Sequence, residues 1–130
     1  MAKGRVLVVD DEADLRKSIR LILTKADYDV VEAEDGEQAI AAIRSGDNPL
    51  AVSAVICDLV MPKVNGMEAI AFFRSQFPGV PMLVLTGHPN IENMTELYKQ
   101  GVVDYLVKPI APEKLLAAVE KAVSKRKLFD

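Results

Sequence analysis

Five short apolar runs recur along the chain and restrict its fold more than any other feature. They are RVLVVD from Arg5, YDVVEA from Tyr28, SAVICD from Ser53, MLVLTG from Met82 and VDYLVK from Val103. Three of them are nearly continuous Val, Leu and Ile, which is typical of strands covered on both faces. Because a longer amphipathic stretch follows each segment, the pattern predicts five βα units in an α/β fold with a parallel sheet.

The intervening stretches carry apolar residues at helical spacing, and they predict five helices. Their expected buried stripes are Leu15, Ile19, Ile22 and Ala26; Ala39, Ile40 and Ile43; Met67, Ile70 and Ala71; Ile91, Met94 and Tyr98; and Leu115, Val119, Ala122 and Val123. Asn65 and Asn90 are expected to cap the third and fourth helices, Gly101 to end the fourth, and Pro112 to begin the fifth. The stretch 47–49 reads as a turn before the third strand.

With 130 residues, half of them apolar, we expect one domain over 1–130, with 124–130 as a C-terminal tail.

Composition argues against several classes of function. The formal charge of -3 disfavours nucleic-acid binding by this domain, because phosphate binding needs clustered Lys and Arg. The single cysteine cannot form an internal disulfide. The sequence shows neither an N-terminal apolar signal segment nor an apolar run of about 18 residues, so we expect a cytoplasmic protein that does not enter a membrane.

Polar and charged residues end the predicted strands. Ligands of open parallel sheets bind beyond the carboxyl ends of the strands, where the strand order reverses. The residues found at these ends are Asp10, Asp11 and Glu12 after the first strand, Asp58 after the third, Thr86 after the fourth and Lys108 after the fifth. Two charges about 4 Å apart repel by roughly 4 kcal/mol at an effective dielectric near 20, so clustered carboxylates need a cation. Carboxylates with Mg²⁺, a lysine and a hydroxyl indicate phosphoryl chemistry.

Four motifs occur in order at these strand ends: VLVVDDEADLR, ICDLVMPKVNGMEAI, LVLTG and GVVDYLVKPI. In this combination the chain resembles a response-regulator receiver domain of two-component signalling over essentially its whole length. The resemblance implies a flavodoxin-like doubly wound five-stranded sheet of order 2-1-3-4-5. It also implies that Asp58 is the phosphoacceptor. The implied Mg²⁺ ligands are Asp10, Asp11, Asp58 and the backbone carbonyl of Val60, with Asp11 as the more direct ligand.

The same resemblance implies a phosphorylation-controlled switch rather than a turnover enzyme. Asp58 would take a phosphoryl group from the phosphohistidine of a histidine kinase, from a phosphotransfer protein or from a small donor, assisted by Lys108 and Thr86. Thr86 and Tyr105 would then change position, and the bond from Lys108 to Pro109 would be cis. The fourth helix, fifth strand and fifth helix would present the result to a downstream target or an output domain missing from this chain, or to a second copy in a phosphorylation-dependent homodimer.

Two other functions use a related sheet. Haloacid-dehalogenase-like phosphatases also use an Asp nucleophile with Mg²⁺, but theirs ends the first strand and a second Asp follows two residues later, where this chain has Glu12. A flavin-binding electron carrier would need a phosphate-cradling loop after the first strand, where the acids of this chain would repel the cofactor. His88 and Val60 flank the expected site; His88 is read either as an influence on water access or as a solvated loop residue.

Overall fold

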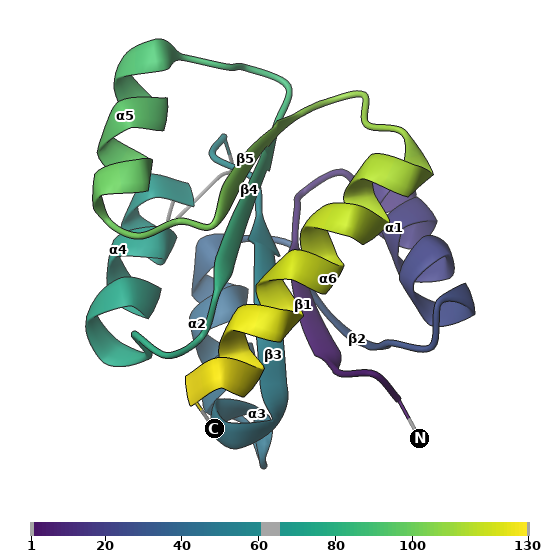
Figure 1. Ribbon diagram of the computed structural model, residues 1–130. Helices are drawn as coiled ribbons and strands as arrows, with labels where there is room; N and C mark the ends of the chain where they lie inside the picture. Colours follow the sequence, from purple (N-terminus) through teal and green to yellow (C-terminus); the bar gives the residue numbers. More distant parts are fainter. Residues whose placement is uncertain (1, 61–65, 130) are drawn as a thin grey trace.

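The computed structural model describes residues 2–60 and 66–129 (Figure 1). Its strands are β1 (Arg5–Val9), β2 (Asp29–Ala33), β3 (Val52–Cys57), β4 (Met82–Thr86) and β5 (Asp104–Val107). Its helices are α1 (Ala13–Lys25), α2 (Gly36–Arg44), α3 (Asn48–Ala51), α4 (Gly66–Gln76), α5 (Ile91–Lys99) and α6 (Pro112–Phe129). The five predicted strands are all present, within one residue of their predicted starts.

The strands form one parallel sheet of order β2-β1-β3-β4-β5, which confirms the predicted order. From β1 the chain continues to β2 on one side, and it returns later to place β3 on the other side. Val9 is level with both Ala33 and Cys57. The residues that follow β1 and β3 therefore emerge side by side at the edge where the strand order reverses.

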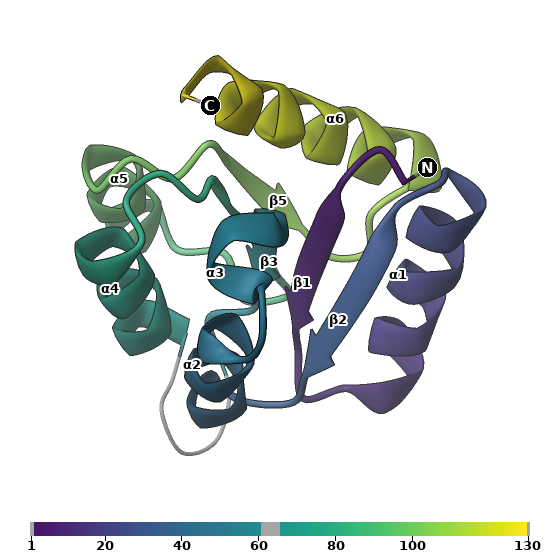
Figure 2. The same cartoon turned by 90° about the horizontal axis from the view of Figure 1, so that it is seen from below.

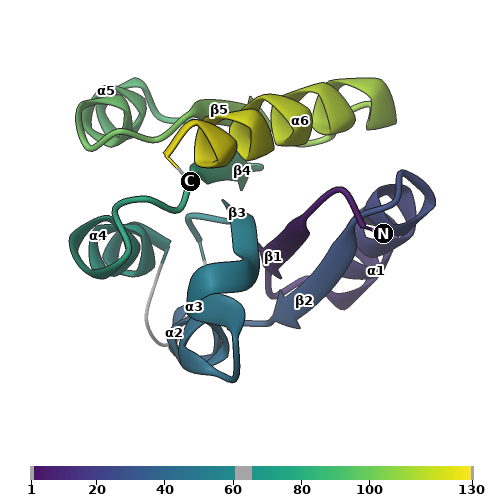
Figure 3. The same cartoon turned by 60° about the horizontal axis from the view of Figure 1, so that its bottom comes forward.

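Helices cover both faces of the sheet, as Figures 2 and 3 show. On one face α1 and α6 pack against a core that includes Ile19, Leu23 and Val119. On the other face α2, α4 and α5 bury a second core, which includes Ile43 and Phe73. Because both faces are covered, β1, β3 and β4 are almost continuously apolar and buried, as the sequence predicted for three strands.

The buried face of α5 differs from the predicted stripe. Leu97 is fully buried, whereas Ile91 is 80% exposed and Tyr98 is 45% exposed; only Met94 of the predicted set packs against the core. Residues 94 and 97 satisfy helical spacing as well as 91, 94 and 98 do, so periodicity could not separate the two faces. Tyr98 lies at the edge, where its hydroxyl donates to Asp104 Oδ1 at 3.3 Å.

The five predicted helices are present, and within the described residues the expected turn at 47–49 leads into one more, the short helix α3. Pro49 lies in its first turn, where its lack of an N–H costs no hydrogen bond. Arg5 holds this turn to β1 through bonds to Asp47 Oδ1 at 2.8 Å and Asn48 Oδ1 at 2.9 Å.

The other predicted helix ends have mixed outcomes. Asn90 caps α5 by accepting from the Asn93 N–H at 3.1 Å, and Gly101, with φ of +98°, follows its end. Pro112 begins α6, which continues to Phe129, so most of the expected tail is helical. Asn65 lies outside the described residues.

Across the described ranges, every helix falls short of the length and apolarity that crossing a membrane requires.

Candidate functional site

Four acidic side chains meet at the carboxyl ends of β1 and β3. The sheet ladder continues one residue past each strand, since the Asp10 N–H donates to Ala33 O at 3.1 Å and the Asp58 N–H to Val9 O at 3.0 Å. Asp10 and Asp58 are 2% and 4% exposed, while Asp11 and Glu12 face solvent. Each of the four offers a carboxylate oxygen, and these oxygens all lie within 4.8 Å of one another. We call these four residues the acidic cluster.

Lys108 supplies the positive charge next to the acidic cluster. Its Nζ lies 2.8 Å from Asp10 Oδ2, 3.0 Å from Asp58 Oδ2 and 3.1 Å from Glu12 Oε1. The residue follows β5, and its backbone N–H extends the ladder by donating to Thr86 O at 2.8 Å. The peptide bond from Lys108 to Pro109 is cis, as expected. One ammonium group therefore bonds carboxylates from two separate loops.

Burial and charge oppose each other in this site. Burial raises the pKa of Asp10, and the hydrogen bond from Lys108 lowers it, with the net direction upward. Burial lowers the pKa of Lys108, but its bonds to the three carboxylates outweigh this and raise that pKa above the usual lysine value. Lys108 therefore stays protonated at neutral pH and keeps its charge opposite Asp10 and Asp58.

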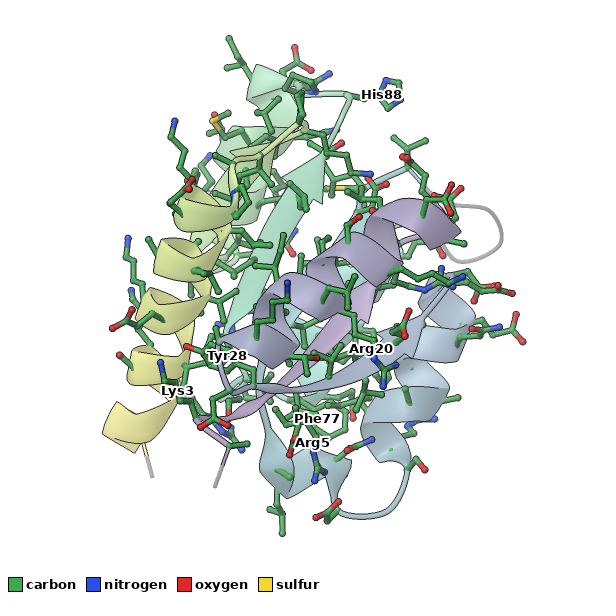
Figure 4. The ribbon with its side chains drawn as sticks, turned by 90° about the vertical axis from the view of Figure 1, so that its right-hand side faces the viewer. Lys3, Arg5, Arg20, Tyr28, Phe77 and His88 are labelled. Carbon is green, nitrogen blue, oxygen red and sulfur yellow. The ribbon has the colours of Figure 1, made fainter. Side chains whose placement is uncertain are left out.

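A cleft of about 170 Å³ opens beside Asp58. It is lined by Asp11, Glu12, Asp58, Val60, Gly87, His88 and Lys108. The Val60 N–H donates to Asp58 Oδ1 at 3.2 Å, so both oxygens of Asp58 have donors. His88 is exposed, and its ring extends outward from the loop after β4 (Figure 4). The Asp58 carboxylate is thus held in position at the wall of an open cleft.

Two expected switch residues lie next to the acidic cluster rather than within it. Thr86 is fully buried at the end of β4, and its Oγ1 accepts from the His88 N–H at 3.1 Å. Tyr105 on β5 is 8% exposed, and its hydroxyl accepts from the Asn90 N–H at 3.2 Å. Both side chains are therefore tied to the loop that leads from β4 into α5.

Gly66, the first residue of α4, allows that helix to begin directly against the end of β3. A Cβ atom at this position would lie 2.0 Å from the carbonyl oxygen of Asp58. The Gly66 N–H donates to Leu59 O at 3.1 Å. The start of α4 therefore supports the peptide that carries Asp58, and any larger residue would displace it.

The donor set fits a hard divalent cation. Carboxylate oxygens from Asp10, Asp11 and Asp58 are the ligands that Mg²⁺ prefers, and the open side of the cleft suits an ion that keeps several waters.

Cys57 precedes Asp58 but is fully buried, and burial raises the pKa of its thiol, so it stays protonated. Arg16 contacts the Asp10 backbone, and sequence reasoning did not predict this contact. The position of Arg16 at the end of VDDEADLR, close to the acids, was the one sequence feature that could have indicated it.

The fold and the site define a class: a doubly wound α/β domain with an acidic pocket and a lysine at the carboxyl ends of its parallel strands. The sequence model of the response regulator receiver domain matches residues 6–120. The chain belongs to this family, whose members act in two-component signalling as switch modules rather than turnover enzymes, and its acidic pocket agrees with a phospho-aspartate switch.

Individual relatives agree with this assignment. The chain is 37% identical over 126 residues to the response regulator MprA of Mycobacterium ulcerans, covering 97% of this chain and 53% of that protein. It is 31% identical over 121 residues to the transcriptional regulatory protein FixJ of Bradyrhizobium diazoefficiens, covering 93% and 57%. The chain thus spans about half the length of these relatives. A receiver domain protein from Clostridium thermocellum superimposes with a TM-score of 0.90 at 28% identity, covering 98% of this chain and 99% of that one.

Proposed function

We propose that this chain is a phosphorylation-controlled signalling switch in which the carboxylate of Asp58 accepts a phosphoryl group. The carboxylate attacks phosphorus, a new O–P bond forms, and the bond from phosphorus to the donor's nitrogen or oxygen breaks, so the leaving group departs with that electron pair. The donor is the phosphohistidine of a histidine kinase or phosphotransfer protein, or a small phosphodonor. The product is an aspartyl phosphate.

The observation that carries this proposal is the setting of Asp58. Asp58 is 4% exposed, yet it lines an open cleft, with Oδ2 held by Lys108 and Oδ1 by the Val60 N–H. The obstacle to attack is repulsion between this anion and an anionic phosphoryl group. The Lys108 ammonium lies where it can bond a phosphoryl oxygen as well as Asp58, which lowers that repulsion.

Mg²⁺ fits the acidic cluster, and we propose Asp10, Asp11, Asp58 and the Val60 carbonyl as its protein ligands. When bound, the ion neutralises charge on phosphoryl oxygens. Asp10 and Asp11 place carboxylates next to Asp58, and the bond from the Glu12 N–H to Asp10 Oδ1 at 2.8 Å orients the side chain of Asp10.

The signal leaves the site through Thr86 and Tyr105. The Thr86 hydroxyl can exchange its bond with the His88 N–H for one to a phosphoryl oxygen, which draws the loop between β4 and α5 toward the cleft. Tyr105 is bonded to Asn90 at the end of this loop. Movement of the loop therefore changes the α5–β5–α6 surface, by as much as phosphorylation favours one arrangement over the other. That surface would bind a downstream protein, an output domain or a second copy of the chain.

Labelling with a phosphodonor tests the assignment of Asp58. We expect intact-mass spectrometry with acetyl phosphate and Mg²⁺ to show the gain of one phosphoryl group on the parent protein and no gain on Asp58→Asn. Asp29→Asn is the matched control, because Asp29 is an exposed carboxylate at the amino end of β2. Labelling of Asp58→Asn at the parent rate would exclude Asp58 as the acceptor.

A further inference from the structure

Arg16 on α1 contacts the loop that carries half of the acidic cluster. Its Nη1 donates to the backbone carbonyl of Asp10 at 2.7 Å, and its backbone N–H donates to the carbonyl of Glu12 at 3.0 Å. The carbonyl groups on both sides of Asp11 are therefore bonded to one residue. Arg16 is not among the residues that line the cleft. Its contact with the site is therefore through the backbone of the loop and not through the cleft itself.

A second contact fixes the guanidinium itself. Arg16 Nε donates to Glu32 Oε1 at 2.9 Å, and the other Glu32 oxygen bonds Arg20. The Arg16 and Glu32 side chains are 16% and 24% exposed, so both are partly desolvated. The hydrogen bond from Arg20 is the main reason that the pKa of Glu32 is lowered; burial opposes it, and Arg16 adds to the lowering. Glu32 therefore stays ionised and anchors Arg16 to β2.

These contacts form a support from β2 through Arg16 to the loop of Asp10 and Asp11. The loop needs support, because its carboxylates repel each other and Asp58. Arg16 also brings a positive charge to the Asp10 carbonyl without occupying a ligand position. A lysine could supply the charge but not two bonds in the fixed fork geometry of a guanidinium.

We propose that Arg16 is a positioning residue for the cation site, holding the Asp10–Glu12 loop in its binding geometry through the Asp10 carbonyl. This inference rests on the proposed function, because it takes the acidic cluster as a Mg²⁺ site. Loss of groups that orient metal ligands typically lowers metal affinity by about 10–100-fold. We expect Arg16→Met to weaken Mg²⁺ binding at least about tenfold, and Arg16→Lys to give an intermediate loss.

Arg20→Met is the matched control. Arg20 lies on the same helix, on the side that faces β2 (Figure 4), and bonds the same Glu32. Among the described contacts, it makes none to Asp10. Both variants remove an arginine that pairs with Glu32, so a general loss of stability would appear in both. Only Arg16→Met removes the bond to the metal-binding loop.

Two measurements on the unphosphorylated protein test the proposal. Calorimetric titration with Mg²⁺ gives the affinity, and amide hydrogen exchange without Mg²⁺ reports the Glu12 N–H, which is bonded to Asp10 Oδ1. We expect faster exchange at Glu12 and weaker binding in Arg16→Met, with Arg20→Met within about twofold of the parent in both. Equal effects in the two variants, or no effect in either, would overturn the role of Arg16. If the parent failed to bind Mg²⁺, the metal-site part of the proposed function would fall, and the exchange result would still decide whether Arg16 holds the loop.

Discussion

Lys108 is the residue on which the electrostatics of the site depend most. Its ammonium bonds carboxylates of Asp10, Asp58 and Glu12, and two of these are almost fully buried. Removing one partner of a buried charge pair leaves the other without compensation, which costs more than the pair contributes. We therefore expect Lys108 to contribute to stability as well as to the proposed phosphoryl transfer.

We expect Lys108→Met, measured without Mg²⁺, to lower the free energy of unfolding at pH 7 by about 1–3 kcal/mol. The loss should shrink as the pH falls. Burial already raises the pKa of Asp10, and losing the Lys108 bonds raises it further. An acid whose folded pKa is raised destabilises the folded state by an amount that grows as the pH rises from its unfolded pKa to its folded pKa, and this effect is absent below both.

Urea unfolding at several pH values measures this dependence. Lys121→Met, which removes an exposed lysine on α6, is the control and should change stability by less than about 0.5 kcal/mol at every pH. A loss in Lys108→Met that stayed constant or grew on acidification would show that the charge of Asp10 is not the cause.

At the scale of elements, α5 shows how a helix can match a periodic pattern and still present a different face. Leu97 fills the core between α5 and the sheet, while Ile91 extends into solvent. Tyr98 bonds Asp104, and its hydroxyl also accepts from the Tyr105 N–H at 3.2 Å. The helix is therefore held to the sheet by the apolar packing of Leu97 and to β5 by the hydrogen bonds of Tyr98.

We expect Leu97→Ala to lower the free energy of unfolding by about 2–5 kcal/mol, because it leaves a cavity in the core. Ile91→Ala, in the same helix, should change it by less than about 0.5 kcal/mol. Chemical denaturation of both variants measures the difference. Similar losses in the two would mean that α5 buries Ile91 after all.

At the scale of the whole molecule, the site exists only because the parallel sheet forms. Asp10 and Asp58 are separated by 47 intervening residues, and Lys108 follows Asp58 by another 50. Parallel pairing brings their strand ends to one edge (Figure 1). The unfolded chain has no such cluster, so a cation that binds there stabilises the folded state.

We expect Mg²⁺ at about 100 times its dissociation constant to stabilise the folded protein by about 2.7 kcal/mol, which raises Tm by roughly 10 °C for a domain of this size. Calorimetric melting with and without the ion measures the shift. NaCl at matched ionic strength should give a much smaller change, and Asp11→Asn should lose most of the Mg²⁺ effect. An equal shift with NaCl would indicate screening instead of a bound ion.

The sequence alone predicted the strands, because apolar runs are local signals. It predicted their order through the resemblance to a known family. Runs such as VLVV before Asp10 and AVIC before Asp58 need burial on both faces, and few folds provide it. Acids placed just after two such runs then predicted a cluster at the carboxyl edge, and the structure brings them within 4.8 Å of one another. The roles of Asp58, Thr86 and Tyr105 in signalling remain predictions.

Tertiary structure decided the features that depend on which side chains meet. The buried face of α5, the short helix α3 and the bond from Arg16 to the Asp10 carbonyl all rest on contacts between distant segments. Sequence spacing gives the period of a helix, but its rotation about its own axis is set by what it packs against. A guanidinium likewise finds its acceptors only after the sheet has placed Glu32 beside the end of β1.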